Sequence, residues 1–257
     1  MTIRDAIRSE RESMKKRSLK DKIAYFWEYH KGIILGVVIV LSMIGAYVIS
    51  VTGQKEMRLC GVFMDTSPMD ETQVYMDAFG DMVGIDPNVY DFFADTSYYL
   101  EEETVLDMKV YDTLKMLGAR VSVNEVDTIA GRQHYFLELA YQEYFVDLRT
   151  VFTEQQLAEL EPYILYIDQD IVRLQKELAE NLEVYTKAYP DPKNTAAMGE
   201  PIPIGLDMDG ATEEFHKALH MLGEEQAIGI VRNSLRTDTA VQFVLYVFGK
   251  LEGNIPA

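Results

Sequence analysis

The stretch Gly32 to Val51 reads GIILGVVIVLSMIGAYVISV, twenty consecutive residues without a charge. At ~1.5 Å per residue a helix of this length spans roughly 30 Å, the thickness of the hydrocarbon core of a bilayer. The run also lacks the polar stripe expected of a helix buried in a soluble domain. Four aromatic residues, Tyr25, Phe26, Trp27 and Tyr29, precede it, as is typical of a membrane interface. The stretch therefore predicts a transmembrane helix.

Charge on either side of this stretch predicts its orientation. Residues 1–31 hold nine Lys or Arg against five acids, a net +4, whereas the residues after 51 hold fifteen against thirty-seven, a net −22. Positive segments stay on the cytoplasmic side. We therefore expect a basic cytoplasmic segment (1–31), a transmembrane helix (32–51), a linker (52–56) and an extracytoplasmic domain (57–257) in the cell membrane.

The apolar stretch is interpreted as an uncleaved signal-anchor. It is longer than the apolar part of a typical signal peptide, and no A-x-A cleavage site follows it. A lipid-anchored protein needs small residues before the modified cysteine, but Arg58 and Leu59 precede Cys60. A cleaved signal peptide and a buried helix of a soluble protein are the alternatives.

The composition of the remaining 200 or so residues excludes several classes of protein. Hydrophobic residues make up 48% of the chain and aromatic residues 11%, which indicates a packed core rather than a disordered tail. A single cysteine cannot form an internal disulfide. The net charge of −22 would repel nucleic acid, so no nucleic acid partner is expected. The predicted partner is the lipid bilayer, which the chain contacts through Gly32 to Val51.

Strand and helix patterns alternate along this part of the chain, which predicts an α/β fold with a mainly parallel sheet. Thr153 and Gln156 form a capping box at the start of one helix. The expected strands are 58–64, 89–94, 125–129, 163–167, 204–208 and 227–231. The expected helices are 69–82, 101–117, 131–141, 153–161, 171–189, 212–222 and 239–248, with a loop at 190–203.

Two stretches resemble the extracellular solute-binding proteins of ABC importers. The first is Val126 to Ile129 followed by Ala140 to Leu148, which is similar to a strand ending in an acid, a helix and a turn of that family. The second is Ala227 to Ser234 (AIGIVRNS) followed by Ala240, Phe243 and Tyr246. It is similar to the return strand, the Asn-Ser turn and the last helix.

The resemblance implies a periplasmic-binding-protein-like fold that binds a solute. The chain departs from the family pattern in two places, because Glu143 replaces the usual turn glycine and Thr237-Asp238 stands where a proline is usual. The domain is also short for two lobes around a deep cleft. A membrane helix in place of a lipid anchor resembles membrane-anchored relatives of Gram-positive bacteria, whose ligands are mostly unassigned.

Acids and hydroxyls follow the first three predicted strands, and ligands of open α/β sheets bind beyond the carboxyl ends of strands. We therefore expect a shared cleft that binds a cationic or polyhydroxylated ligand, with the alternative that each cluster only caps a helix. The candidate ligand-binding residues are Asp65, Thr66, Asp95, Ser97, Tyr98, Tyr99 and Asp127.

The sequence contains no catalytic or cofactor motif that we recognise. It lacks G-x-S-x-G, Walker A and G-x-G-x-x-G patterns, so we expect no enzyme, no cofactor and no catalytic residue. His216 and His220 are interpreted as surface residues, and Asp207 to Gly210 as a turn, so no metal site is expected.

Two functions follow from these observations. The first is a membrane-tethered binding domain that captures a small solute, such as a sugar or peptide, for transport or sensing with a membrane permease. The second is a non-catalytic accessory subunit of a cell-envelope complex whose cleft is degenerate.

Overall fold

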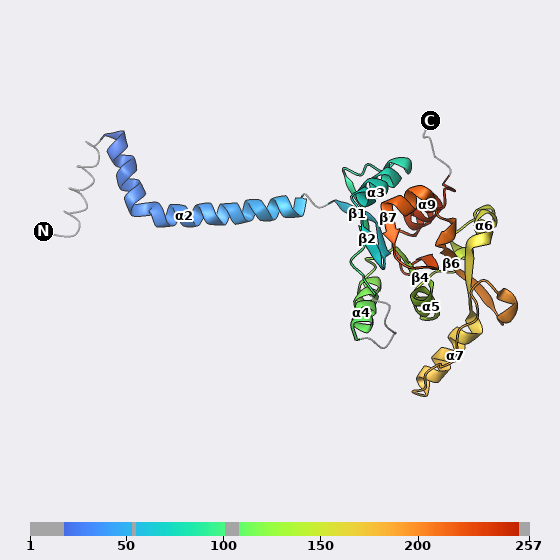
Figure 1. Ribbon diagram of the computed structural model, residues 1–257. Coiled ribbons are helices and arrows are strands. Elements are labelled where there is room, and N and C mark those ends of the chain that lie inside the picture. The colour runs from blue at the N-terminus through green and yellow to red at the C-terminus, as the bar shows by residue number, and fades with distance from the viewer. Residues whose placement is uncertain (1–17, 53–54, 101–107, 252–257) are drawn as a thin grey trace. The chain divides into compact units, whose positions relative to one another are not determined.

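The computed structural model describes residues 18–52, 55–100 and 108–251 (Figure 1). The chain divides into two compact units, Met1–Gln54 and Lys55–Ala257. The first unit contains the helix α2 and the second contains the remaining described helices and strands.

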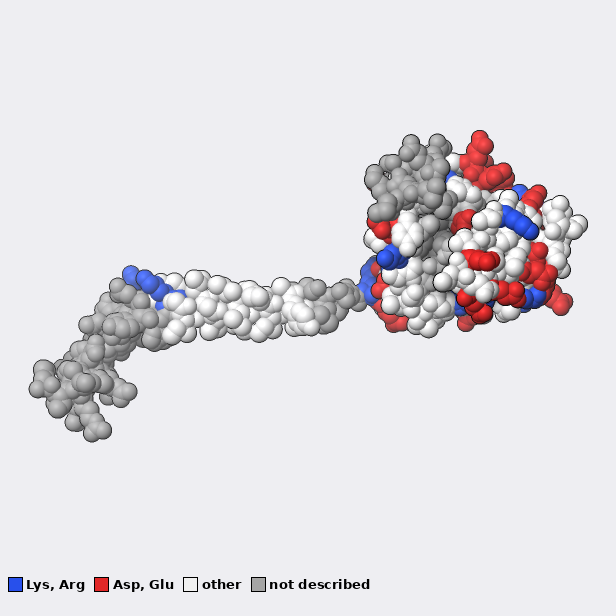
Figure 2. All heavy atoms as spheres, turned by 90° about the horizontal axis from the view of Figure 1, so that it is seen from below, with Lys and Arg blue, Asp and Glu red and all other residues white. Residues whose placement is uncertain are grey.

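Helix α2 (Leu19–Thr52) carries the apolar stretch. Its part from Lys31 to Val48 is long and apolar enough to cross a membrane or to act as a signal sequence, and none of it is buried. Figure 2 shows the residues that follow Lys31 as a band without charged side chains. The predicted helix is therefore present, and it begins well before the apolar stretch. The predicted charged segment before residue 18 lies outside the described residues.

The helices and strands of the second unit alternate as the sequence patterns predict, with small differences at their ends. In chain order they are β1 (Glu56–Phe63), β2 (Thr66–Pro68), α3 (Glu71–Met82), β3 (Tyr90–Asp95), α4 (Met108–Ser122), β4 (Thr128–Arg132), α5 (Gln133–Tyr141), η1 (Leu148–Thr150), α6 (Glu154–Leu160), η2 (Glu161–Tyr163), β5 (Ile164–Asp168), α7 (Gln169–Glu180), η3 (Thr195–Ala197), β6 (Pro201–Asp207), η4 (Met208–Gly210), α8 (Glu213–Ala218), β7 (Leu219–Met221), β8 (Gln226–Ile230) and α9 (Thr237–Val247).

Six strands form one sheet in the order β3-β1-β4-β8-β6-β5. Strand β1 runs parallel to β3 and β4, but β8 is antiparallel to β4 and β6, and β5 is antiparallel to β6. The α/β class is confirmed, but the sheet is mixed rather than mainly parallel. Buried strands of either direction have similar apolar patterns, so direction depends on pairing that the local sequence does not encode.

The two faces of the sheet are covered by different helices. Along β1, Leu59 and Phe63 contribute to one core cluster, which includes residues of α3, α8 and α9. Val62 and Met64 contribute to a second cluster, which includes residues of α4, α5 and α7. This alternation follows from the two-residue period of a strand, and it places α4, α5 and α7 on the same face.

Three predicted elements need correction. The predicted strand at 125–129 begins three residues later, as β4 (Thr128–Arg132). The predicted helix at 212–222 ends at Ala218, and Leu219–Met221 instead forms β7, which pairs antiparallel with β2. The predicted helix at 171–189 ends at Glu180, so residues 181–189 are free to fold back beside it. Of the predicted helix at 101–117, residues 101–107 lie outside the described residues.

Candidate functional site

Asp65 lies directly after β1 and holds together three other segments. Its side chain is fully buried, its Oδ1 accepts the N–H of Leu100 at 2.5 Å, and its Oδ2 lies 3.2 Å from Nε of Arg132. Its carbonyl oxygen accepts the N–H of Leu222. Burial raises the pKa of Asp65, while the N–H of Leu100 and the charge of Arg132 act in the opposite direction.

Asp95, at the end of β3, is held by a second arginine. Its carboxylate accepts hydrogen bonds from the Ser97 hydroxyl at 2.6 Å, from the Ser97 N–H and from Arg120 of α4. Arg120 also donates to the Tyr98 hydroxyl at 3.1 Å. Burial alone would raise the pKa of Asp95, but the Ser97 and Arg120 hydrogen bonds outweigh it and hold the pKa below its usual value.

Asp127 is held by a third arginine and lies just before β4. Its Oδ2 accepts the N–H of Cys60 at 2.7 Å and Nε of Arg236 at 2.8 Å, and its Oδ1 accepts the Ser234 hydroxyl at 2.6 Å. The carboxylate is fully buried. It therefore links β1 to the turn that precedes α9.

These three acids do not meet at one edge of the sheet. In the parallel register Asp95 lies opposite Val62, and Thr128 lies opposite Gly61, so Asp127 is level with Cys60. Asp65 lies five residues after Cys60 in the chain, in the turn that follows the end of β1 at Phe63. The placement of Asp127 at a strand end was wrong, because β4 begins after it.

The other predicted ligand-binding residues differ widely in exposure. Thr66 is buried in β2 and donates to the Met64 carbonyl, and Tyr98 is 5% exposed. Ser97 is exposed, and Tyr99 is 57% exposed. In this structure the buried acids hold arginines and backbone N–H groups instead of facing solvent, so ligand binding at these residues stays a prediction.

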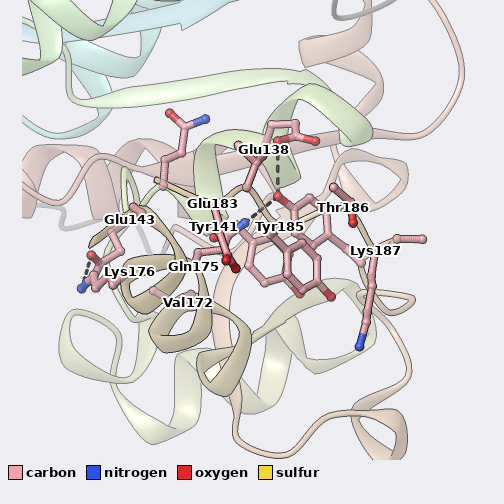
Figure 3. Close-up of a pocket in the computed structure, with 15 residues that line it drawn as sticks. Glu138, Tyr141, Glu143, Val172, Gln175, Lys176, Glu183, Tyr185, Thr186 and Lys187 are labelled. Carbon is pink, nitrogen blue, oxygen red and sulfur yellow. Dashed lines mark hydrogen bonds and ion pairs between the residues drawn. The ribbon is translucent and has the colours of Figure 1, made fainter. Parts of the chain in front are cut away.

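A groove beside α5 is open to solvent. It has a volume of about 790 Å³ and lies between the end of α5, helix α7 and the segment 183–189 (Figure 3). Binding sites for small ligands usually have volumes of ~300–1,000 Å³. The groove exists because residues 181–189 leave the axis of α7 and pass alongside it.

Tyrosine rings form one side of this groove. Tyr141 and Tyr189 stack with ring centroids 3.9 Å apart and planes inclined by 10°, and Tyr185 lies parallel to Tyr189 at 5.7 Å. Burial raises the pKa of Tyr141 to about 12 and also raises the pKa of Tyr189. The hydroxyls of Tyr141 and Tyr189 therefore remain protonated at neutral pH.

A chain of hydrogen bonds crosses the groove. Gln175 of α7 donates to the Tyr189 hydroxyl at 2.9 Å, and this hydroxyl donates to Oε2 of Glu138 at 3.4 Å. Burial raises the pKa of Glu138, although the Tyr189 hydroxyl opposes this. The carboxylate has about four lone-pair positions, and Tyr189 occupies one of them.

One carboxylate at the side of the groove pairs with two cations. Glu143 lies 2.5 Å from Nζ of Lys176 and 3.0 Å from Nη1 of Arg232. Glu143 has φ of +63°, so a left-handed turn exists where the resemblance predicted a glycine. Figure 3 shows the Glu143–Lys176 pair at one side, with Tyr185, Thr186 and Lys187 at the other.

A second hollow of about 260 Å³ adjoins the groove, since Glu138 and Gln142 line both. It lies between α4 and α5, and its lining includes Tyr111, Tyr135 and Tyr144. Tyrosine side chains therefore line both hollows on either side of the same two polar residues, Glu138 of α5 and Gln142 just after it.

The sequence analysis missed this groove. Glu138, Gln175 and Tyr185 come from three segments that no short motif joins. The one available signal was a set of three tyrosines, Tyr141, Tyr185 and Tyr189, all of which fall within predicted helices.

Comparison of the chain with protein-family models, with curated proteins and with solved structures gives no match. The similarity to solute-binding proteins therefore stays a prediction from two stretches of sequence, and a functional proposal depends on the geometry of the groove and on the apolar helix.

Proposed function

We propose that this chain is a single-pass membrane protein whose outer domain captures a small solute at the membrane surface. The N-terminus is cytoplasmic and the unit Lys55–Ala257 is outside the cell membrane. The apolar part of α2 and the charge difference across it support this orientation. The protein acts by binding and not by catalysis, and it delivers its ligand to a permease or sensor.

The groove between α5 and α7 is the observation that carries the proposal. It combines aromatic rings with three carboxylates, two lysines, two glutamine side chains and hydroxyl groups, all within one open hollow. Few, well-placed polar groups on an aromatic wall are typical of small-ligand sites. Because the domain is tethered, the ligand is held within reach of the membrane and is not carried away.

Two measurements test the proposal. Protease treatment of intact cells is expected to degrade the outer domain and to spare a tag at the N-terminus; the reverse pattern contradicts the orientation. A thermal-shift screen of the full chain in lipid nanodiscs against sugars, peptides, amino acids and divalent cations is expected to give at least one positive shift. A flat result across all classes contradicts solute binding.

An accessory subunit of an envelope complex is the second candidate function. It is favoured by Asp65, Asp95 and Asp127, whose carboxylates all hold arginines within the domain, as expected where a strand-end cleft has degenerated. Photocrosslinking from a reactive group placed at Gln142, with the full chain inserted in its membrane, distinguishes the two functions. One defined protein adduct, together with a flat ligand screen, would support the accessory function.

The proposal includes a distant relationship to the membrane-anchored solute-binding proteins of Gram-positive bacteria. It rests on Val126 to Leu148 and on Ala227 to Tyr246, the two stretches described above. A structure of the chain with bound ligand tests this relationship. A two-lobed solute-binding protein holds its ligand between its lobes, whereas the groove of this chain lies beside α5 and α7.

A further inference from the structure

We propose that the groove and the adjoining hollow together bind a neutral, linear oligosaccharide that lies across α5. This inference names the class of ligand for the proposed solute-binding function and rests on it. The observations that carry it are the tyrosine-lined walls, the balance of charge and the shared polar residues of α5.

The walls suit the flat faces of sugar rings. Tyr185 lies parallel to Tyr189, which in turn stacks on the buried Tyr141, so the tyrosine stack is anchored in the core at one end. A pyranose ring places its C–H groups against an aromatic face and leaves its hydroxyls at the ring edge. Tyr185 and Tyr189 are both partly exposed, and Tyr185, at the free end of the stack, provides the first such surface.

The polar groups suit hydroxyls. The Gln175–Tyr189–Glu138 chain fixes one Glu138 oxygen and leaves further lone-pair positions for a ligand O–H. Gln142 and Thr186 add an amide and a hydroxyl, which both donate and accept. A ligand with many hydroxyls can use donors and acceptors of both kinds.

The charges oppose an anionic ligand. Lys176 is already paired with Glu143, and Lys187 is exposed, extending away from Glu138 in Figure 3. An anion in the groove would therefore face the Glu138 carboxylate. A polyamine could pair with Glu138 and Glu183, but its ammonium groups only donate hydrogen bonds and would leave the amide N–H groups of Gln142 without an acceptor.

The second hollow explains why the ligand is longer than one sugar. It shares Glu138 and Gln142 with the groove and continues the tyrosine lining through Tyr111 and Tyr144. A chain of rings crossing these two residues contacts both hollows, whereas a monosaccharide fills only a part of the first. Affinity is therefore expected to increase with the number of linked units.

The test is calorimetric titration of the full chain in lipid nanodiscs, which avoids detergents with sugar head groups. The probes are neutral glucose and N-acetylglucosamine oligomers of about two to six units, an oligogalacturonate and spermidine. We expect binding of a neutral oligomer that strengthens with length and no binding of the other two. Tyr185→Ala is expected to weaken binding by about ten-fold.

Phe93→Ala, at an exposed aromatic residue that lines neither hollow, is the matched control and is expected to leave affinity unchanged. Because Tyr185→Ala removes part of a stack, Glu138→Gln provides a second variant that keeps the shape of the side chain and is also expected to weaken binding. If spermidine or oligogalacturonate binds and the neutral oligomers do not, the assignment of a neutral oligosaccharide is overturned but solute binding is not. Unchanged oligomer affinity in both groove variants overturns the location. A flat screen across all solute classes overturns the proposed function as well.

Discussion

Nε of Arg236 lies 2.8 Å from the Asp127 carboxylate, although the two residues are separated by 109 positions in the chain. The carboxylate also accepts the N–H of Cys60, so one buried side chain connects β1, the start of β4 and the turn before α9. Asp65 with Arg132 and Asp95 with Arg120 repeat this arrangement at other levels of the sheet. The three acids that were predicted to bind a ligand thus stabilise the connections between strands and helices.

Arg236→Met should destabilise the domain strongly. It leaves a fully buried carboxylate without its cation, and loss of one partner of a buried pair costs about 3–5 kcal/mol. Urea unfolding followed by circular dichroism measures the change. Arg149→Met breaks the exposed pair with Asp147 and is the control, with an expected cost of about 0–1 kcal/mol. Equal costs for the two variants would show that the Asp127 pair has no special structural role.

Cys60 should react with thiol reagents only when the domain unfolds. Its side chain is 1% exposed, and burial raises its pKa to about 11, so very little thiolate exists at pH 8. Labelling with a maleimide is expected to be at least about 100-fold slower in the folded chain than in denaturant. Rapid labelling of the folded chain would mean that β1 opens in the native state.

The sequence predicts the long apolar helix and much of the first half of the sheet because their signals are local. Strands β1 and β3 are short apolar runs, and the capping box at Thr153 and Gln156 is present as predicted. Strand β4 was placed too early since its second half, Ala130 to Arg132, contains small residues without an apolar pattern. The three-residue strands β2 and β7 are too short to show any period.

The groove could not be predicted for a different reason. Its residues come together only because α5 and α7 cover the same face and because residues 181–189 fold back after Glu180. The direction of β8, β6 and β5 likewise depends on long-range pairing. Neither property has a counterpart in the local sequence.

Glu143 offers a test of backbone strain against ion pairing. Its φ of +63° is unfavourable for a residue with a Cβ, while its carboxylate pairs with Lys176 and Arg232, both of which are largely exposed. Glu143→Ala keeps the strain and loses both pairs, with an expected cost of about 1 kcal/mol. Glu143→Gly loses the pairs but relieves about 1 kcal/mol of strain, so its stability should be close to that of the parent chain. Thermal unfolding that ranks glycine below alanine would contradict this assignment.

Glu138→Gln should increase stability at neutral pH while it weakens ligand binding. Burial raises the pKa of Glu138 above that of an unfolded carboxyl group, so between these two values the native state binds more protons than the unfolded state. Stability therefore falls as pH rises through this window, and the loss persists at higher pH. The neutral glutamine removes it, so the melting temperature of the variant relative to the parent should be higher at pH 7 than at pH 4.

Glu177→Gln, on an exposed part of α7 outside the groove, controls for removal of a carboxylate. It is expected to show no such difference between the two pH values. A Glu138→Gln variant that is less stable than the parent at pH 7 would mean that the carboxylate supports the fold through its bond with Tyr189. Greater stability combined with weaker oligosaccharide binding is instead the pattern of a carboxylate kept for function at a cost to the fold.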